Sequence, residues 1–199
     1  MKRICVFCGS SPGSQPEYVE LAAQLGKELA KKNIGLVYGG GSVGMMGVLA
    51  TSVVKNNGDV TGVITRQLFE MEVGFTQLSD LRIVESMHER KALMAELSDG
   101  FIALPGGFGT LDEMFEILTW SQLNIHRKPC GFLNVNGYYN KLIAFIDHMI
   151  LENFVNPSCR ELVQVDEHPA RLLEKFYNYM PILSDKGEWA RKLATVNKN

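Results

Sequence analysis

The chain has 199 residues, of which 46% are hydrophobic and 21% are charged, a composition typical of a globular protein with a sizeable core. A formal net charge of -2 argues against electrostatic binding to long nucleic acids or to anionic membranes. No apolar run approaches the roughly 18 residues of a membrane helix, and the apolar stretch near the start is shorter than a signal peptide requires. These features predict a cytoplasmic protein.

Short apolar runs alternate with amphipathic helical patterns along the chain. Apolar strands that alternate with helices are typical of a parallel sheet whose two faces are both covered. We therefore predict an α/β protein in which residues 1–180 form a single Rossmann-like, doubly wound parallel sheet flanked by helices, followed by a polar tail over residues 181–199. In chain order, the expected elements are a strand at Arg3–Phe7, a helix at Glu17–Lys32, a strand at Gly35–Tyr38, a helix at Val43–Asn56, a strand at Val60–Ile64, a strand at Leu81–Val84, a helix at His88–Leu97, a strand at Gly100–Leu104, a helix at Leu111–Gln122, a strand at Cys130–Asn134, a helix at Tyr139–Glu152, a strand at Leu162–Val165 and a helix at Pro169–Tyr179.

The four cysteines favour buried, reduced thiols. Cys5 and Cys8 form a C-x-x-C pair, a spacing that also occurs in redox proteins. Here the pair belongs to a predicted strand, where an odd spacing directs the two side chains to opposite faces of the sheet. Cys130 and Cys159 are isolated in the sequence, so we expect structural rather than redox roles for all four.

Ligands of a doubly wound sheet bind beyond the carboxyl ends of its strands, where four loops are candidates. The first loop, Cys8–Ser14, has the sequence CGSSPGS and follows the first expected strand. Its glycines and the hydroxyl of Ser10 could reach a ligand. A plain turn with a helix cap explains the same residues equally well, so both interpretations stay open.

The second loop, Tyr38–Gly47, has the sequence YGGGSVGMMG and opens an expected helix. Its G-x-G-x-x-G pattern favours a phosphate or mononucleotide site, with Gly40, Gly41 and Gly44 as candidate binding residues. A complete dinucleotide site would have an acidic residue about 20 residues further on, and Val63–Thr65 occupy that place. The G-x-x-x-x-G-K-[ST] pattern of the NTPase P-loop is absent from the sequence.

The third candidate is the segment Met87–Leu97, with the sequence MHERKALMAEL. Arg90 and Lys91 lie in the first turn of the expected helix, where the helix dipole disfavours cations. An incoming anion or a facing carboxylate would compensate for that position. The alternative is a solvated basic patch beside Glu89.

The fourth candidate, Phe101–Trp120, has the sequence FIALPGGFGTLDEMFEILTW. A glycine-rich turn joins an apolar strand to an amphipathic helix, and the free N–H groups at the start of such a helix form an anion site. Glu113 follows one helical turn behind the anion site. For Asp112 and Glu116 we expect only the general preference for acids near a helix start. The candidate binding residues in this turn are Gly106, Gly107, Phe108, Gly109 and Thr110.

Arg90 and Glu113 are expected to converge on one ligand. We predict that the strands at Leu81–Val84 and Gly100–Leu104 are neighbours, about 4.8 Å apart in a parallel sheet. The helices that follow them would then begin at the same edge, roughly 10 Å apart. Side chains as long as arginine and glutamate can close that gap.

Two of these segments resemble the LOG (LONELY GUY) family. PGGFGTLDE, Pro105–Glu113, is similar to its PGGxGTxxE motif, and MHERK, Met87–Lys91, is similar to its MxxRK element. CVFCGSS and VYGGGSVGMMG also look like family segments, and the resemblance extends over Arg3–Val165. Members are cytokinin riboside 5′-monophosphate phosphoribohydrolases, and many bacterial members act similarly on AMP. The resemblance therefore implies hydrolysis of the N-glycosidic bond of a nucleoside 5′-monophosphate to free base and ribose 5-phosphate.

The resemblance also implies roles for the candidate residues. Arg90 and Glu113 would be catalytic, with Glu113 facing the sugar and the oxocarbenium-like transition state while Arg90 orients it. The glycine-rich turn would bind the 5′-phosphate. The implied substrate-binding residues are Ser10, Gly40, Gly41, Gly44, Met87, Lys91, Gly106, Gly107, Phe108, Gly109 and Thr110. The family further implies a homodimer without a cofactor, and the four histidines lack the spacing of metal ligands.

Two other functions are alternatives. A non-catalytic carrier of a nucleotide or of molybdenum cofactor would have the same fold, but phosphate binding alone requires neither Arg90 nor Glu113. Some family members carry the label lysine decarboxylase, which would need pyridoxal phosphate on a Schiff-base lysine, and Lys91 is a poor candidate for that role. Base selectivity stays open. An adaptable pocket for the base could involve Met45, Met46, Met71, Met87 and Met94, although core packing explains most of them.

Overall fold

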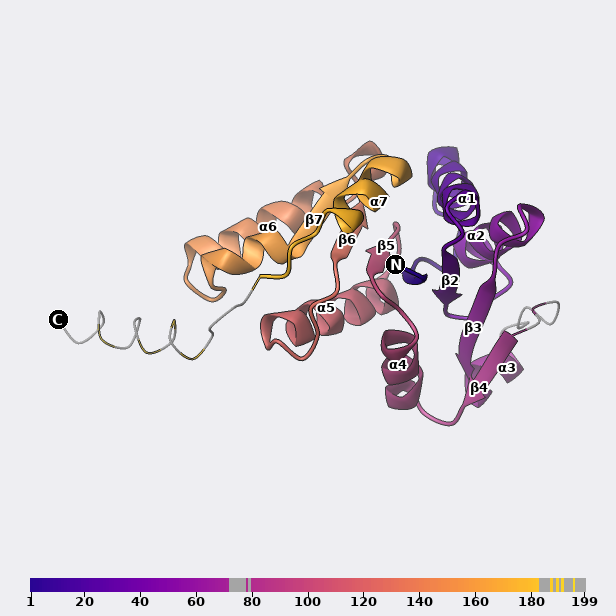
Figure 1. Cartoon of the computed structure of the whole chain (residues 1–199), viewed down its shortest axis with the longest axis horizontal. Coiled ribbons are helices and arrows are strands. Elements are labelled where there is room, and N and C mark those ends of the chain that lie inside the picture. Colours follow the sequence, from indigo (N-terminus) through magenta and orange to yellow (C-terminus); the bar gives the residue numbers. More distant parts are fainter. Residues whose placement is uncertain are drawn as a thin grey trace.

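A computed structural model describes residues 1–71, 78, 80–182 and the single positions 187, 189, 191 and 195. Within these residues, strands and helices alternate as expected from the sequence (Figure 1). The expected polar tail over residues 181–199 falls for the most part outside the described residues. The elements are β1 (Arg3–Phe7), α1 (Pro16–Lys31), β2 (Gly35–Tyr38), α2 (Gly44–Lys55), β3 (Val60–Thr65), α3 (Arg66–Met71), β4 (Asp80–Val84), α4 (Met87–Glu96), β5 (Phe101–Ala103), α5 (Phe108–Gln122), β6 (Cys130–Leu133), the 3-10 helix η1 (Val135–Gly137), α6 (Asn140–Leu151), the 3-10 helix η2 (Pro157–Leu162), β7 (Val163–Asp166) and α7 (Pro169–Tyr177).

The seven described strands form one parallel sheet in the order β4-β3-β2-β1-β5-β6-β7. The chain winds outward from β1 to β4, returns to the other side of β1 as β5, and winds outward again to β7. Val6 of β1 therefore lies between Tyr38 of β2 and Ile102 of β5 in the register. The winding direction reverses between β1 and β5, where loops at the carboxyl ends diverge and leave room for a ligand. This topology confirms the α/β, doubly wound fold.

The expectation that the strands at 81–84 and 100–104 are neighbours is wrong. Between β4 and β5 lie β3, β2 and β1, because β4 is an edge strand and β5 pairs with β1. The connection between them, α4, crosses back over the sheet and packs more on β3 than on β4. Figure 1 shows α4 beside α5 at the same end of the sheet. The two helices thus meet even though their preceding strands do not.

Two other features differ from the expected elements. The short helix α3 follows β3 directly, and Thr65 Oγ1 accepts a hydrogen bond from the Leu68 N–H at 3.3 Å. Its six residues bury no side chain, so it has no amphipathic pattern from which it could have been predicted. Helix α5 begins at Phe108 rather than at Leu111, which places Gly109 and Thr110 in its first turn.

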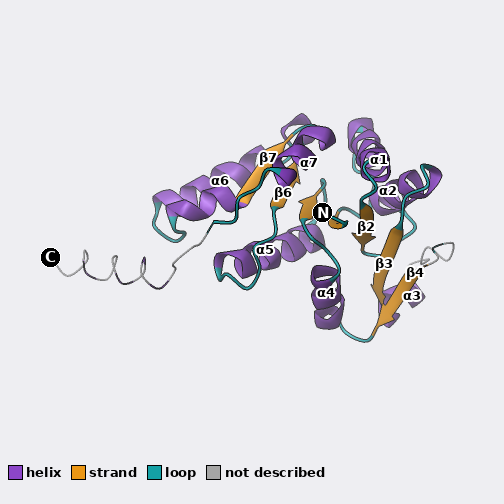
Figure 2. Ribbon diagram, viewed as in Figure 1, coloured by secondary structure: helices purple, strands orange, loops and turns teal. Residues whose placement is uncertain are grey.

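Helices cover both faces of the sheet (Figure 2), and the hydrophobic core has two layers, one on each face. Side chains of α1, α2 and α7 pack on one face, and those of α4, α5 and α6 pack on the other. Cys8 belongs to the first layer and Cys5 to the second, as the odd spacing predicts. All four cysteines are buried, and burial raises the pKa of Cys5, Cys8 and Cys130. Buried thiols with raised pKa values are poor nucleophiles, which agrees with structural roles.

None of the helices in the described parts of the chain has both the length and the apolar character needed to span a bilayer.

Candidate active site

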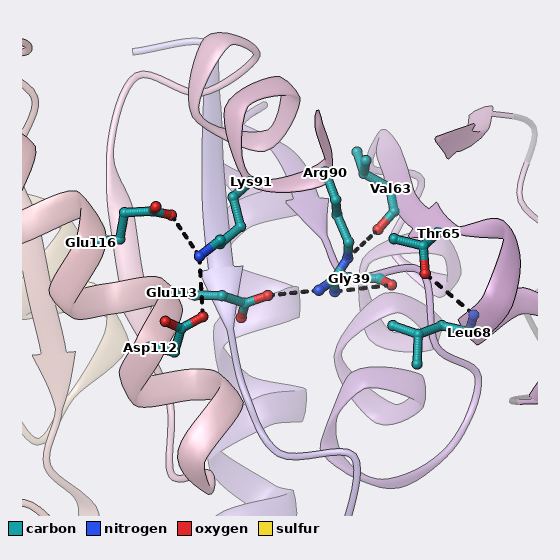
Figure 3. A network of polar contacts seen from close by, with 9 residues as sticks. All are labelled: Gly39, Val63, Thr65, Leu68, Arg90, Lys91, Asp112, Glu113 and Glu116. Carbon is teal, nitrogen blue, oxygen red and sulfur yellow. Dashed lines mark hydrogen bonds and ion pairs between the residues drawn. The ribbon is translucent and has the colours of Figure 1, made fainter. Parts of the chain in front are cut away.

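A buried ion pair joins α4 to α5. Arg90 Nη1 donates to Glu113 Oε1 at 2.9 Å, and the two side chains are only 9% and 10% exposed (Figure 3). Arg90 lies in the first turn of α4, where the helix dipole alone would disfavour a cation. The facing carboxylate compensates for this position, as anticipated from the sequence. The pair also shows how α4, returning across the sheet, reaches the start of α5.

Two backbone carbonyl groups hold the other side of the Arg90 guanidinium. Nε donates to the Val63 carbonyl of β3 at 3.0 Å, and Nη2 donates to the Gly39 carbonyl after β2 at 3.4 Å (Figure 3). A Cβ atom at Gly39 would collide with Nη2. A side chain at position 39 would therefore push the Arg90 guanidinium away from its contacts with Val63 and Glu113, a role of this glycine that the glycine-rich motif alone does not reveal.

Lys91 points away from this pair. Its Nζ lies 3.3 Å from Asp112 Oδ2 and 3.1 Å from Glu116 Oε2, and the Lys91 side chain is 14% exposed (Figure 3). Asp112 and Glu116, for which only a helix-start preference was expected, thus form the partners of the second cation in α4. Lys91 does not line the cavity described below.

The glycine turn, which we define as residues 104–110, forms the start of α5. Gly107 is the N-terminal cap residue, and no side chain caps the first turn. The N–H groups of the first three helical residues, Phe108 to Thr110, consequently have no intrahelical acceptor. A Cβ atom at Gly107 or Gly109 would meet nothing within 4 Å, so both residues face open space. The uncapped positive end of the helix dipole makes this turn suited to an anion.

A cavity of about 340 Å³ lies at the carboxyl ends of β1 and β2, between the glycine turn and α4. It brings together eight of the residues singled out from the sequence: Ser10, Met87, Arg90, Gly107, Phe108, Gly109, Thr110 and Glu113. Eight other residues also line it: Val6, Phe7, Cys8, Gly9, Gly39, Met46, Leu68 and Asp112. Of these, Gly9 belongs to the first candidate loop and Met46 was considered for a base pocket, whereas sequence reasoning gave no site role to Val6, Phe7, Leu68 or Asp112. Cys8 and Gly9 follow β1 directly and belong to the loop that the sequence indicated as the first candidate.

Five of the candidate binding residues lie outside the lining: Gly40, Gly41, Gly44, Lys91 and Gly106. Gly40 and Gly44 have φ values of +78° and +60°, a backbone conformation that favours glycine. A Cβ atom at Gly44 would collide with the Ser10 carbonyl, and one at Gly106 would lie 2.9 Å from the Gly9 nitrogen. These glycines allow the loops around the cavity to pack closely together.

The cavity also has an apolar wall that includes Met46, Leu68 and Met87. Of the other methionines considered from the sequence, Met45 and Met94 are buried in the core and Met71 is 74% exposed. Flexible methionine side chains accommodate apolar groups of different shapes.

The carboxyl group of Glu113 is the buried acid of the cavity. Burial raises its pKa above the ordinary value, and the Arg90 guanidinium opposes that shift. Asp112, by contrast, has a side chain that is 60% exposed. Perturbed acids in a cavity are typical of catalytic sites. In the described part of the chain, no three histidine, cysteine or acidic residues are arranged to hold a metal ion.

Comparisons with known proteins agree with the motifs. A family model described as "Possible lysine decarboxylase" matches residues 46–176. The cytokinin riboside 5′-monophosphate phosphoribohydrolases LOG7 and LOG1 of Arabidopsis thaliana are 49% and 48% identical to this chain over 180 residues, which cover 90% of the chain and 83% and 84% of those relatives. The chain belongs to the LOG family. Its two motif-bearing segments, 87–91 and 105–113, meet at the Arg90–Glu113 pair.

Solved structures of low sequence identity share the fold. The molybdenum cofactor binding protein from Rippkaea orientalis has a TM-score of 0.68 at 21% identity, covering 89% of this chain and 97% of that chain. The molybdenum cofactor carrier protein from Chlamydomonas reinhardtii has a TM-score of 0.67 at 19% identity, covering 89% of this chain and 99% of that chain. At these identities the likeness shows the fold alone.

Removing the cation from the buried pair should destabilise the protein strongly. In Arg90→Met, the Glu113 carboxylate is left in the interior without its partner, and we expect the free energy of unfolding at pH 8 to fall by about 3–5 kcal/mol. Burial raises the pKa of Glu113 and the Arg90 guanidinium opposes that shift, so without Arg90 the pKa should rise further in the variant. As the pH falls through this raised pKa, the carboxyl group takes up a proton and becomes neutral. The loss of unfolding free energy should therefore be smaller at pH 5 than at pH 8. Denaturant titrations at both pH values measure the difference.

The matched control is Arg66→Met, which breaks an exposed pair with Glu85 whose side chains are 58% and 66% exposed. It should change stability little at either pH. The double variant Arg90→Met/Glu113→Gln should recover much of the loss of Arg90→Met. Equal losses at pH 8 and pH 5, or additive losses in the double variant, would contradict the assignment.

Proposed function

We propose that this chain hydrolyses the N-glycosidic bond of a nucleoside 5′-monophosphate, AMP or an N6-modified cytokinin ribotide, to free base and ribose 5-phosphate. The observation that carries this proposal is the position of the buried Arg90–Glu113 pair beside the uncapped start of α5 in one cavity. Relatives at 48–49% identity are named for this reaction, which supports it further. We also propose that the protein is located in the cytoplasm.

In the proposed complex, the glycine turn binds the phosphate through the N–H groups at the start of α5 and the hydroxyl of Thr110. Glu113 follows Thr110 by one helical turn, so the sugar attached to the phosphate lies next to its carboxylate. Cleavage of the bond between sugar and base builds positive charge on the anomeric carbon, and a carboxylate stabilises that charge. Arg90 holds the carboxylate in a fixed orientation in a site shielded from water.

The apolar wall of the cavity is the part suited to the base. Met46, Leu68 and Met87 supply surface that can pack against a purine and an apolar N6 substituent. We therefore include both AMP and N6-modified nucleotides in the proposed substrate class.

Purified protein should release base from AMP and from its N6-isopentenyl derivative, and chromatography of the products measures both reactions. Adenosine is the matched control, because it lacks only the phosphate for which the glycine turn is proposed. A protein that binds AMP without releasing base above the buffer rate would instead act as a carrier.

The variant Glu113→Gln should separate chemistry from binding. It preserves side-chain shape but removes the charge, so kcat for AMP should fall by roughly 10²–10³-fold, the scale of a lost electrostatic stabiliser. KM should change little, because the phosphate contacts are equal in ground and transition states. Thr110→Ala should show the opposite bias, with a raised KM and a smaller effect on kcat.

Glu116→Gln is the matched control for the charge change, since Glu116 lies one turn further along α5 and outside the cavity lining. Its kcat should stay within about twofold of the wild-type value. A near-normal kcat for Glu113→Gln would remove the centre of the proposed mechanism.

We further propose that the protein is a homodimer. Large apolar side chains are exposed near the end of α5 and along and after α6: Leu123, Ile125, Phe145, Leu151 and Phe154 are between 45% and 80% exposed. Such residues on a globular surface are typical of an interface between subunits.

Light scattering at micromolar concentration should give twice the chain mass of 22.2 kDa. Replacing Phe145 and Phe154 together with serine should shift the protein to the monomer mass, and a wild-type monomer would contradict the proposal.

A further inference from the structure

Three consecutive carbonyl groups of the glycine turn accept hydrogen bonds from outside the turn. The Leu104 carbonyl accepts from Tyr139 Oη at 2.6 Å, and the Gly106 carbonyl accepts from Tyr138 Oη at 2.7 Å. Between them, the Pro105 carbonyl accepts from the Gly9 N–H at 3.1 Å. The three peptide planes that precede the start of α5 are thus all held by neighbouring loops.

The contact at Gly106 fixes the peptide that leads into the helix. In a planar trans peptide the C=O and N–H groups point in opposite directions. With the Gly106 carbonyl directed at Tyr138, the Gly107 N–H points away from Tyr138. Gly107 lines the cavity and Tyr138 does not, so this N–H is directed to the side on which a ligand would lie. Glycines at positions 106 and 107 would otherwise leave this peptide free to rotate.

Tyr138 is itself placed by a turn and by aromatic contacts. The turn after β6 contains two residues with positive φ, Asn136 at +50° and Gly137 at +69°. The ring of Tyr138 packs edge-on against Tyr18, with centroids 5.6 Å apart, and against Tyr139, with centroids 4.9 Å apart. Tyr138 is nevertheless 42% exposed, so burial alone does not account for the position of its hydroxyl.

We propose that Tyr138 is a positioning residue for phosphate binding: its hydroxyl fixes the peptide between Gly106 and Gly107 so that the N–H groups at the start of α5 face the 5′-phosphate. This inference rests on the proposed function. It assigns a role in binding to a residue that lies outside the cavity and outside both motif-bearing segments. The hydroxyl of Tyr138 should therefore affect binding of the phosphate end of the substrate and not binding of the base.

The test is Tyr138→Phe in the full chain. The substitution removes one hydroxyl and leaves the ring contacts in place, so melting temperature should change little. KM for AMP should rise about three- to tenfold, the effect of one net hydrogen bond, and kcat should stay within about twofold. As competitive inhibitors, ribose 5-phosphate should weaken by the same factor and adenosine should be unaffected, a selectivity that a merely structural role would not produce.

Tyr18→Phe is the matched control, because Tyr18 belongs to the same aromatic contacts and its hydroxyl donates no hydrogen bond within the described residues. It should leave every constant near the wild-type value. An unchanged affinity of Tyr138→Phe for ribose 5-phosphate, measured by calorimetry, would overturn the inference, as would equal weakening of adenosine. Wild-type protein that binds ribose 5-phosphate without cleaving AMP would contradict the proposed function alone, and the calorimetric comparison would still decide the role of Tyr138.

Discussion

The buried ion pair between Arg90 and Glu113 is the interaction on which the rest of the site depends. Transfer of two charges from water to the interior costs several kcal/mol per ion in real proteins, and the pair compensates only with good geometry and further hydrogen bonds. Arg90 obtains those bonds from the Val63 and Gly39 carbonyl groups. The pair therefore fixes β3, the loop after β2 and α5 relative to one another. Well-packed apolar residues would give comparable stability, so stability alone does not account for a buried ion pair at this position.

The topology of the sheet makes this pair possible. A parallel strand at the edge must be followed by a helix that returns the chain to the centre before the other half of the sheet can form. Here that helix is α4, which passes from β4 over β3 toward β1 and β5. The start of α4 consequently lies beside the second turn of α5, where Arg90 meets Glu113 and Lys91 meets Asp112. The two cations of α4 meet the three acids of α5, with Arg90 directed into the cavity and Lys91 held outside it.

Much of the fold and part of the site could be predicted because the relevant signals are local. Within the described residues, hydrophobic patterns identified all seven strands and six of the seven α-helices, since burial on one face leaves a repeating pattern. Strand order has no local signature, which is why β4 and β5 were wrongly expected to be neighbours. The separate roles of glycines likewise depend on what surrounds each Cα: Gly39 makes room for Arg90, while Gly107 faces open space. No sequence pattern indicated a role for Tyr138 in ligand binding, because its hydrogen bond to the Gly106 carbonyl joins residues 32 positions apart in the sequence.

The position of Lys91 bears on the description carried by the family model. A lysine that forms a Schiff base needs a neutral amine that reaches the reacting carbon, and enzymes obtain it by lowering the lysine pKa. Burial does lower the pKa of Lys91, but hydrogen bonds to Glu116 and Asp112 outweigh that effect, and the net shift is upward. No lysine is among the described residues that line the cavity. The same two acids that keep Lys91 charged also hold it away from Glu113, so the arrangement that opposes amine chemistry leaves Glu113 as the one buried carboxylate among the described residues that line the cavity.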